Sequence, residues 1–126
     1  MADTESQQKP DADKVKKIRI QTGVLKRVAK EKLSYAKQAE KETEQLQKME
    51  ADSSKCEHDI KLIRNCRDES TNMVRVVGRN LTQAHEKLVG IMREVEDDAL
   101  VKETEEYKKM LEVLEEAKPA LALEPY

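Results

Sequence analysis

Apolar positions recur at alternating three- and four-residue spacing along most of this chain, a pattern typical of long helices that keep one face against partner helices. The clearest stripe runs from residue 60 to residue 95, where nine of eleven spaced positions are apolar. Its members are Ile60, Ile63, Arg67, Ser70, Val74, Val77, Leu81, Ala84, Leu88, Ile91 and Val95. This stripe predicts a long helix in a bundle or coiled coil.

An earlier stripe has the same spacing and predicts a helix over about residues 14–50. Its members are Ile18, Gln21, Leu25, Val28, Lys32, Tyr35, Ala39, Glu42, Leu46 and Met49, of which seven are apolar. Gly23 lies inside it and costs about 1 kcal/mol relative to alanine. The packed seam on both sides offsets that cost, so we expect this helix to continue through Gly23.

Polar and small residues interrupt the pattern at 51–54 and again near 96–98. The sequence Ser54-Lys55-Cys56-Glu57 has the form of a capping box and predicts a second helix over about 55–95. The acidic residues 96–98 suit a helix N-terminus and predict a third helix over about 98–118, ended by Pro119. We expect one face of this third helix to carry Leu100, Tyr107, Leu111 and Leu114 beside Met110 and Ala117.

Short connections between these segments force antiparallel neighbours. The sequence therefore predicts an all-α fold, an elongated antiparallel three-helix bundle with coiled-coil-like heptad packing over residues 14–118. Residues 1–13 lack apolar periodicity and are predicted to form a disordered N-terminal arm, and residues 119–126 a flexible C-terminal tail.

Composition argues for a binding protein and against an enzyme. The 126 residues are 40% charged and contain no Trp or Phe, which leaves little material for an aromatic-lined pocket. No phosphate loop, nucleophile motif or zinc spacing occurs, and His58 and His85 read as ordinary helix residues, so we predict no catalytic, cofactor or metal site. Cys56 and Cys66 are too far apart on one helix to pair, and no segment is typical of a membrane span or a signal peptide, which favours the cytoplasm.

Charge is distributed unevenly along the chain. Residues 14–37 hold nine basic side chains and one acid, whereas residues 94–116 hold ten acids and three lysines. The two segments could neutralise each other, because the first and third helices run parallel in such a bundle. The basic face could also remain partly free and attract an acidic protein. Nucleic acid and membrane are less suitable partners, because stacking aromatic residues are lacking and the acidic helix repels phosphate.

The ordered run Lys-Ile-Arg-Ile-Gln-Thr-Gly-Val-Leu-Lys-Arg at 17–27, followed by Lys30-Glu31 and Tyr35, resembles the opening helix of the tubulin-binding cofactor A family. The resemblance continues at 59–61, 68–70, 73–74, 79–81 and 105–108 with similar spacing. It implies a cytoplasmic, cytoskeleton-associated bundle that captures β-tubulin folding intermediates after chaperonin release. It would pass them, through other tubulin-folding cofactors, toward assembly with α-tubulin, without a cofactor or catalysis.

Exposed residues in the matched segments are the expected β-tubulin contacts. They are Lys17, Lys26, Arg27, Lys30, Glu31, Glu69, Arg79 and Glu106. Tyr35 and Tyr107 are assigned to the seam instead. The family usually carries a proline where this chain has Arg75, so we expect a straighter second helix here and weaker transfer of family contacts from residues 72–77.

The residues alone also permit a homodimeric coiled-coil adaptor unrelated to tubulin. That alternative needs an apolar stripe outside the seam, for which Val76, Val89 and Val113 are the candidates. The sequence leaves open whether the protein is a monomer or a homodimer.

Overall fold

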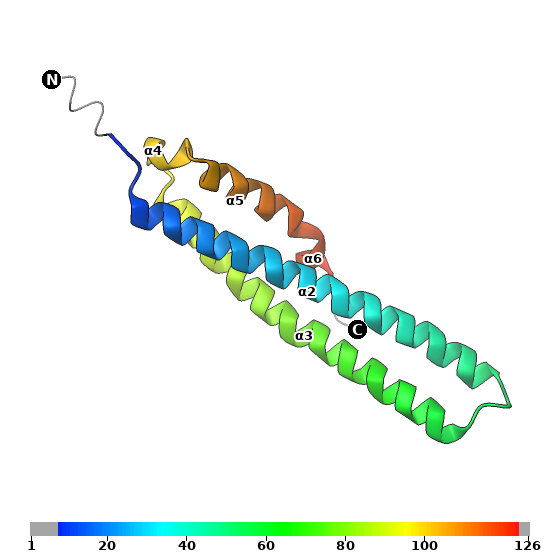
Figure 1. The fold of residues 1–126 in the computed structure, drawn as a ribbon. Coiled ribbons are helices and arrows are strands. Elements are labelled where there is room, and N and C mark those ends of the chain that lie inside the picture. Colours follow the sequence, from blue (N-terminus) through cyan, green and yellow to red (C-terminus); the bar gives the residue numbers. More distant parts are fainter. Residues whose placement is uncertain (1–7, 124–126) are drawn as a thin grey trace.

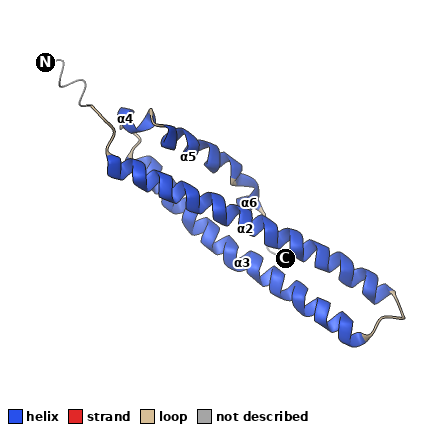
Figure 2. Cartoon of the chain, in the orientation of Figure 1, coloured by secondary structure: helices blue, strands red, loops and turns tan. Residues whose placement is uncertain are grey.

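Two long antiparallel helices form the frame of this protein, and shorter helices cover part of it (Figure 1). The structure is a computed structural model that describes residues 8–123. Helices α2 (Ala12–Ala51) and α3 (Glu57–Glu94) make the hairpin, and α4 (Ala99–Lys102), α5 (Glu105–Glu116) and α6 (Lys118–Ala122) follow. No strand occurs within the described residues, and the predicted all-α class is confirmed (Figure 2).

Helix α2 begins at Ala12, because the Asp11 carboxylate caps it by accepting the backbone N–H groups of Asp13 and Lys14 at 2.9 and 3.4 Å. The helix passes through Gly23 without a break, as predicted. Its 40 residues reach about 60 Å at 1.5 Å per residue. The arm predicted for residues 1–13 is wrong at its last two positions, which are helical; residues 1–7 lie outside the described part.

The turn between α2 and α3 does not contain the predicted capping box. The Asp52 carboxylate accepts both the backbone N–H and the hydroxyl of Ser54, at 2.9 and 2.6 Å. These bonds lower the pKa of Asp52, the hydroxyl bond most. Ser54 does not cap the helix: α3 starts at Glu57, with Cys56 as an N-cap that makes no side-chain bond.

The single third helix predicted over 98–118 is wrong, because two capping residues lie inside that range. Asp98 caps the short α4 by accepting the Val101 N–H at 3.2 Å. Thr104 then ends α4 and starts α5: its hydroxyl donates to the Val101 carbonyl at 2.6 Å and accepts the Tyr107 N–H at 3.2 Å. A side chain that satisfies both helix ends favours a break over a continuous helix.

The chain after α5 is also helical, where a flexible tail was predicted. Pro119 lies in the first turn of α6, where its missing N–H costs nothing, and Leu121 donates to the Ala117 carbonyl at 3.0 Å. Ala120 is fully buried. The predicted tail is therefore wrong over 119–122, and residues 124–126 lie outside the described part.

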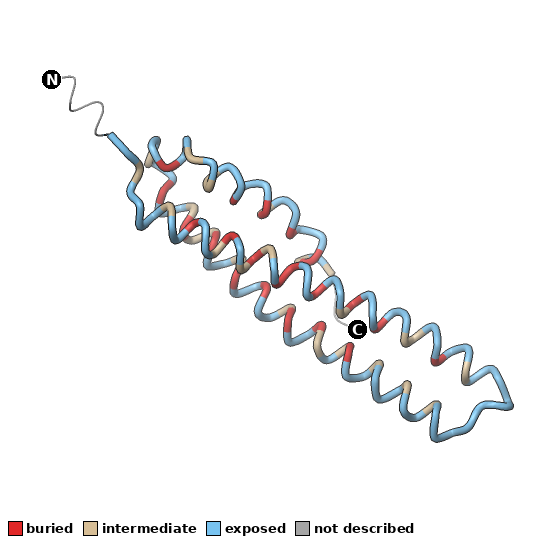
Figure 3. Tube along the Cα trace, in the orientation of Figure 1, coloured by how far each residue is buried: buried red, intermediate tan, exposed pale blue. Residues whose placement is uncertain are grey.

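The core occupies one half of the rod, where three layers of helix meet (Figure 3). Its largest fully buried side chains are Ile18, Leu25, Val74, Leu81, Leu88, Val95, Val101 and Met110. The predicted α3 stripe is buried from Ser70 onward, whereas Ile60, Ile63 and Arg67 are half-buried. Tyr35 and Tyr107 pack against the core as predicted. Whether the helices interlock with heptad geometry stays a prediction.

The face predicted for the third helical segment is partly wrong. Leu111 is 42% exposed, and Leu100 is exposed as well. Met110 and Ala117 are buried as expected, together with Val113, which was assigned to an outer stripe. The break at Thr104 changes the rotation of the later residues about the helix axis, which a single continuous periodicity could not anticipate.

Candidate partner-binding surface

The rod divides into a covered half and an open half. Helix α5 packs on the first part of α2, and α6 reaches both α2 and α3 near the middle of the hairpin (Figure 1). Beyond that point α2 and α3 pair with each other, and no residue of α3 before Ser70 is buried (Figure 3). Leu62, in this open half, is 50% exposed. The molecule therefore offers long side faces rather than one enclosed cavity.

Lys32 marks the boundary between these halves. It occupies a seam position of α2 and is only 5% exposed. Its ammonium group donates to the carbonyls of Ala120 at 2.6 Å and Leu123 at 2.8 Å, at the C-terminal end of α6. Gly78 of α3 leaves room for its stem, since an added Cβ there would lie 3.4 Å from Lys32 Cε. Lys32 thus joins α2 to α6.

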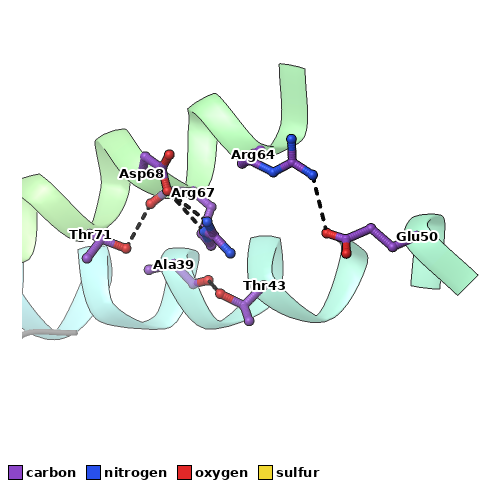
Figure 4. Close-up of polar contacts among 7 residues, drawn as sticks. All are labelled: Ala39, Thr43, Glu50, Arg64, Arg67, Asp68 and Thr71. Atoms are coloured by element: carbon purple, nitrogen blue, oxygen red, sulfur yellow. Dashed lines mark hydrogen bonds and ion pairs between the residues drawn. The ribbon is translucent and has the colours of Figure 1, made fainter. Parts of the chain in front are cut away.

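Polar contacts line the open half, as Figure 4 shows for seven residues. Arg64 of α3 faces Glu50 of α2 at 3.7 Å, and the Ser70 hydroxyl donates to Glu42 at 2.5 Å across the same helix pair. Arg67, at a predicted seam position, instead turns to its neighbour Asp68 at 2.9 Å. In this half, polar side chains occupy positions between α2 and α3 that would otherwise be apolar. Little apolar surface is therefore left for a third helix to cover.

The basic start of α2 is neutralised in part by the acidic segment, as one of the two predicted arrangements requires. Lys14 contacts Asp98 at 3.2 Å, and Lys17 contacts Glu94 at 3.6 Å. The pKa of Asp98 is lowered, first by the hydrogen bond from the Val101 N–H and then by Lys14. Both pairs are exposed to solvent, so screening by water leaves each only a weak contribution to stability.

Three basic side chains in the middle of α2 take no part in this pairing. Within residues 8–123, Lys26, Arg27 and Lys30 form no ion pair. Arg27 and Lys30 are exposed, and Lys26 is half-buried beside α5. Both charge arrangements considered from the sequence therefore coexist: one end is paired internally, and the middle of α2 keeps unpaired positive charge.

The eight predicted contact residues do not meet at one place. Lys26 and Glu106 line the same pocket between α2 and α5. Arg79 lines a groove of about 540 Å³ beside Lys32 and α6, and Glu69 lines another hollow with Tyr35. Lys30 lines a further hollow, together with Lys26. Lys17, Arg27 and Glu31 are exposed on α2 outside these hollows.

The outer apolar stripe predicted for the homodimer alternative is interrupted. Val113 is only 3% exposed and belongs to the core, Val89 is half-buried, and Val76 is 37% exposed. Sequence reasoning instead missed exposed Ile20, Leu33 and Leu62, whose positions outside the heptad pattern gave the only signal. It also missed the role of Lys32, which depends on its contacts with the distant α6.

Other chemistry finds little support in the described part. No group of three or more His, Cys, Asp or Glu side chains within residues 8–123 is arranged to hold a metal ion. Cys56 and Cys66 are both exposed and unbonded. No helix in this range combines the length and the apolar character needed to cross a membrane.

The described chain is an elongated, all-α rod with polar side faces. Comparison with known proteins gives the family. The family model "Tubulin binding cofactor A" matches residues 13–118, and the chain belongs to this family. It is 35% identical over 105 residues to Tubulin-specific chaperone A of Gallus gallus and of Homo sapiens, covering 83% of this chain and 94% of each relative.

A solved structure shares the fold. The crystal structure of tubulin folding cofactor A from Arabidopsis thaliana superposes with a TM-score of 0.76, covering 86% of this chain and 99% of that one. Its sequence identity is 24%, so this likeness supports the fold alone.

Proposed function

We propose that this protein is a tubulin-folding cofactor. It binds β-tubulin folding intermediates released by the chaperonin, keeps them soluble and passes them, by way of other tubulin-folding cofactors, to assembly with α-tubulin. The observation that carries the proposal is the family match, which spans residues 13–118 and hence all the long helices. The role needs no catalysis and no cofactor, and we place it in the cytoplasm, in association with the cytoskeleton.

A rod with a half-covered hairpin suits this task physically. A folding intermediate exposes apolar surface that aggregates, and a long polar face can shield it without exposing the rod's own core. The unpaired charge at Lys26, Arg27 and Lys30 would steer an acidic client and select against basic ones. Lys17, Glu31, Glu69, Arg79 and Glu106 complete the proposed contact set. We propose that the protein acts as a monomer, since Val113 is buried and the outer stripe is interrupted.

The first test is formation of a soluble complex with β-tubulin released from a chaperonin, measured by size exclusion with molar-mass detection. The proposal predicts a complex that lacks α-tubulin. No complex, with the free protein running as a dimer, would favour the adaptor alternative.

A charge-reversal pair then locates the surface. Replacing Lys26, Arg27 and Lys30 with Glu should leave helicity intact and weaken capture, mainly by slowing association. The matched control replaces the exposed Lys37, Lys41 and Lys48 with Glu, which changes net charge equally on the open half of α2. Equal loss in both variants would mean that overall charge, not this surface, governs capture.

A further inference from the structure

A small hollow lies where the end of α5 packs against the middle of α2. Its volume is about 130 Å³, and it is lined by Lys26, Ala29, Lys30 and Leu33 of α2 and by Val113, Glu116 and Ala117 at the end of α5. A cavity of roughly 150 Å³ between apolar side chains accepts a benzene molecule, whereas organic ligand sites usually measure roughly 300–1,000 Å³. The size of the hollow therefore suits one apolar side chain of a protein partner better than a small-molecule ligand.

Leu33 forms the exposed apolar wall of this hollow. It is 43% exposed, whereas the other apolar residues of the lining, Ala29, Val113 and Ala117, are buried. Helix α5 ends at Glu116, so its cover of α2 stops beside Leu33. A single exposed leucine is ordinary on a protein surface, but one that adjoins a hollow can bury its own surface together with a side chain of a partner.

Two lysines lie on the same face of α2 as this leucine. Lys26, Lys30 and Leu33 are four and three residues apart, which places them on one face at steps of about 6 and 4.5 Å along the helix axis. Across residues 8–123 neither lysine forms an ion pair, and Glu116 of the lining forms none either. Two ammonium groups next to an exposed apolar wall complement a partner segment that combines an apolar side chain with a carboxylate.

We propose that this hollow anchors the bound client. One large apolar side chain of the client, such as Leu, Ile, Met or Phe, packs against Leu33, and a carboxylate near it contacts Lys26 or Lys30. The inference rests on the proposed function, which supplies the client, and it adds the kind of segment that is recognised. A folding intermediate exposes such apolar side chains before its own core is complete.

The spacing on α2 restricts the sequence of that client segment. The lysines lie about 5–10 Å from Leu33 along the helix axis. In an extended segment this separation corresponds to about two residues, and in a helical segment to about three or four. The recognised segment therefore carries its acidic residue two positions from the apolar residue if it is extended, and three or four positions away if it is helical.

The leucine and the lysines have different kinetic roles. A desolvated apolar anchor mainly determines how slowly a complex dissociates, whereas charges at the rim mainly determine how fast it forms. Loss of Leu33 should therefore raise the dissociation rate, and loss of Lys26 or Lys30 should lower the association rate.

The test measures association and dissociation rates with β-tubulin released from a chaperonin. Leu33→Ala should weaken capture about tenfold, mainly through faster dissociation. The matched control, Leu62→Ala, removes a leucine that is 50% exposed on the open half and should change capture less than about twofold. Thermal unfolding should be close to wild type for both variants, because both side chains are largely exposed.

Two further variants separate apolar docking from attraction by positive charge. Leu33→Lys adds a cation beside Lys30, so capture should tighten if charge alone governs it. The inference predicts instead a loss at least as large as that of Leu33→Ala, whereas Leu33→Met, which keeps an apolar side chain, should remain close to wild type. Unchanged or tighter capture by Leu33→Lys would overturn the inference, and so would equal losses in Leu33→Ala and Leu62→Ala.

The same experiment distinguishes failure of the anchor from failure of the proposed function. A wild-type chain that forms no complex with β-tubulin overturns both. A wild-type complex that is insensitive to every change at Leu33 overturns only the anchor and leaves the tubulin role intact.

Discussion

Replacing Lys32 with methionine removes the ammonium group that joins α2 to the end of α6 and keeps most of the apolar stem. The lost contacts include the bonds to the carbonyls of Ala120 at 2.6 Å and Leu123 at 2.8 Å. A hydrogen bond that involves a charged group contributes about 1.5–3 kcal/mol. The apolar attachment of α6 is comparable, since it consists mainly of Ala120 and the half-buried Leu121, and one fully buried leucine contributes about 1.5–3 kcal/mol.

Local opening of α6 should therefore become easier by about 2–3 kcal/mol in Lys32→Met, because the carbonyls can bind water once the segment lifts away. The measurement is amide hydrogen exchange. The N–H groups of Leu121 and Leu123, which bond to the carbonyls of Ala117 and Ala120 at 3.0 and 3.3 Å, should exchange roughly 30- to 100-fold faster. Amides in the core of α2 and α3 should change little, because their packing does not depend on α6.

The exposed Lys37 supplies the control, since Lys37→Met makes the same chemical change where no buried bond is lost. Unchanged exchange at Leu121 and Leu123 in Lys32→Met would refute the reasoning. A uniform acceleration along α2 and α3 would refute it as well, because it would show that α6 opens only with the whole bundle.

Three further predictions concern stability. Val113→Asp should destabilise the fold by about 3 kcal/mol or more, because it buries a charge, whereas Leu111→Asp should cost less than about 1 kcal/mol. Thermal unfolding distinguishes the two variants, and similar losses of stability would contradict the assigned buried face of α5. Gly90→Ala should stabilise α3 by about 1 kcal/mol, since the added Cβ meets no atom within 4 Å, and a lower melting temperature would contradict this. Because the pKa of Asp98 is lowered in the folded state, its ionised carboxylate stabilises the fold at pH values above its ordinary pKa of about 3.9. This contribution is lost as the pH falls through the lowered pKa. Denaturant titrations should therefore show that the free energy of unfolding decreases less on acidification in Asp98→Asn than in the exposed control Asp97→Asn.

The sequence predicted the long helices well, because the apolar stripes of α2 and α3 are long enough to indicate a helix despite single polar residues within them. The predictions were wrong at Ser54, Thr104 and Pro119. At each position a single side chain or ring determines which of two local structures forms. Ser54 bonds to the neighbouring Asp52 carboxylate, and α3 begins three residues later, at Glu57, so the turn differs from the predicted capping box through a local contact. Local competition of this kind is not visible in periodicity.

The candidate site was predictable only in its charge. The basic excess of α2 follows from counting, and the contact of Lys14 with Asp98 follows from the parallel run of the first and third segments. Lys17 instead contacts Glu94, at the end of the antiparallel α3. The hollow beside Leu33 depends on which residues of α5 face α2, and that rotation is set by the break at Thr104.

The uneven cover of the hairpin gives the rod a gradient of local stability. Opening free energy follows the number of buried apolar contacts, so the tip around residues 51–57 should fray and re-form many times before the covered half opens once. A binding partner would thus contact a rigid, covered half at one end and a flexible helical hairpin at the other. The conformational entropy that the hairpin loses on binding would lower the affinity, which favours release of the client over permanent retention.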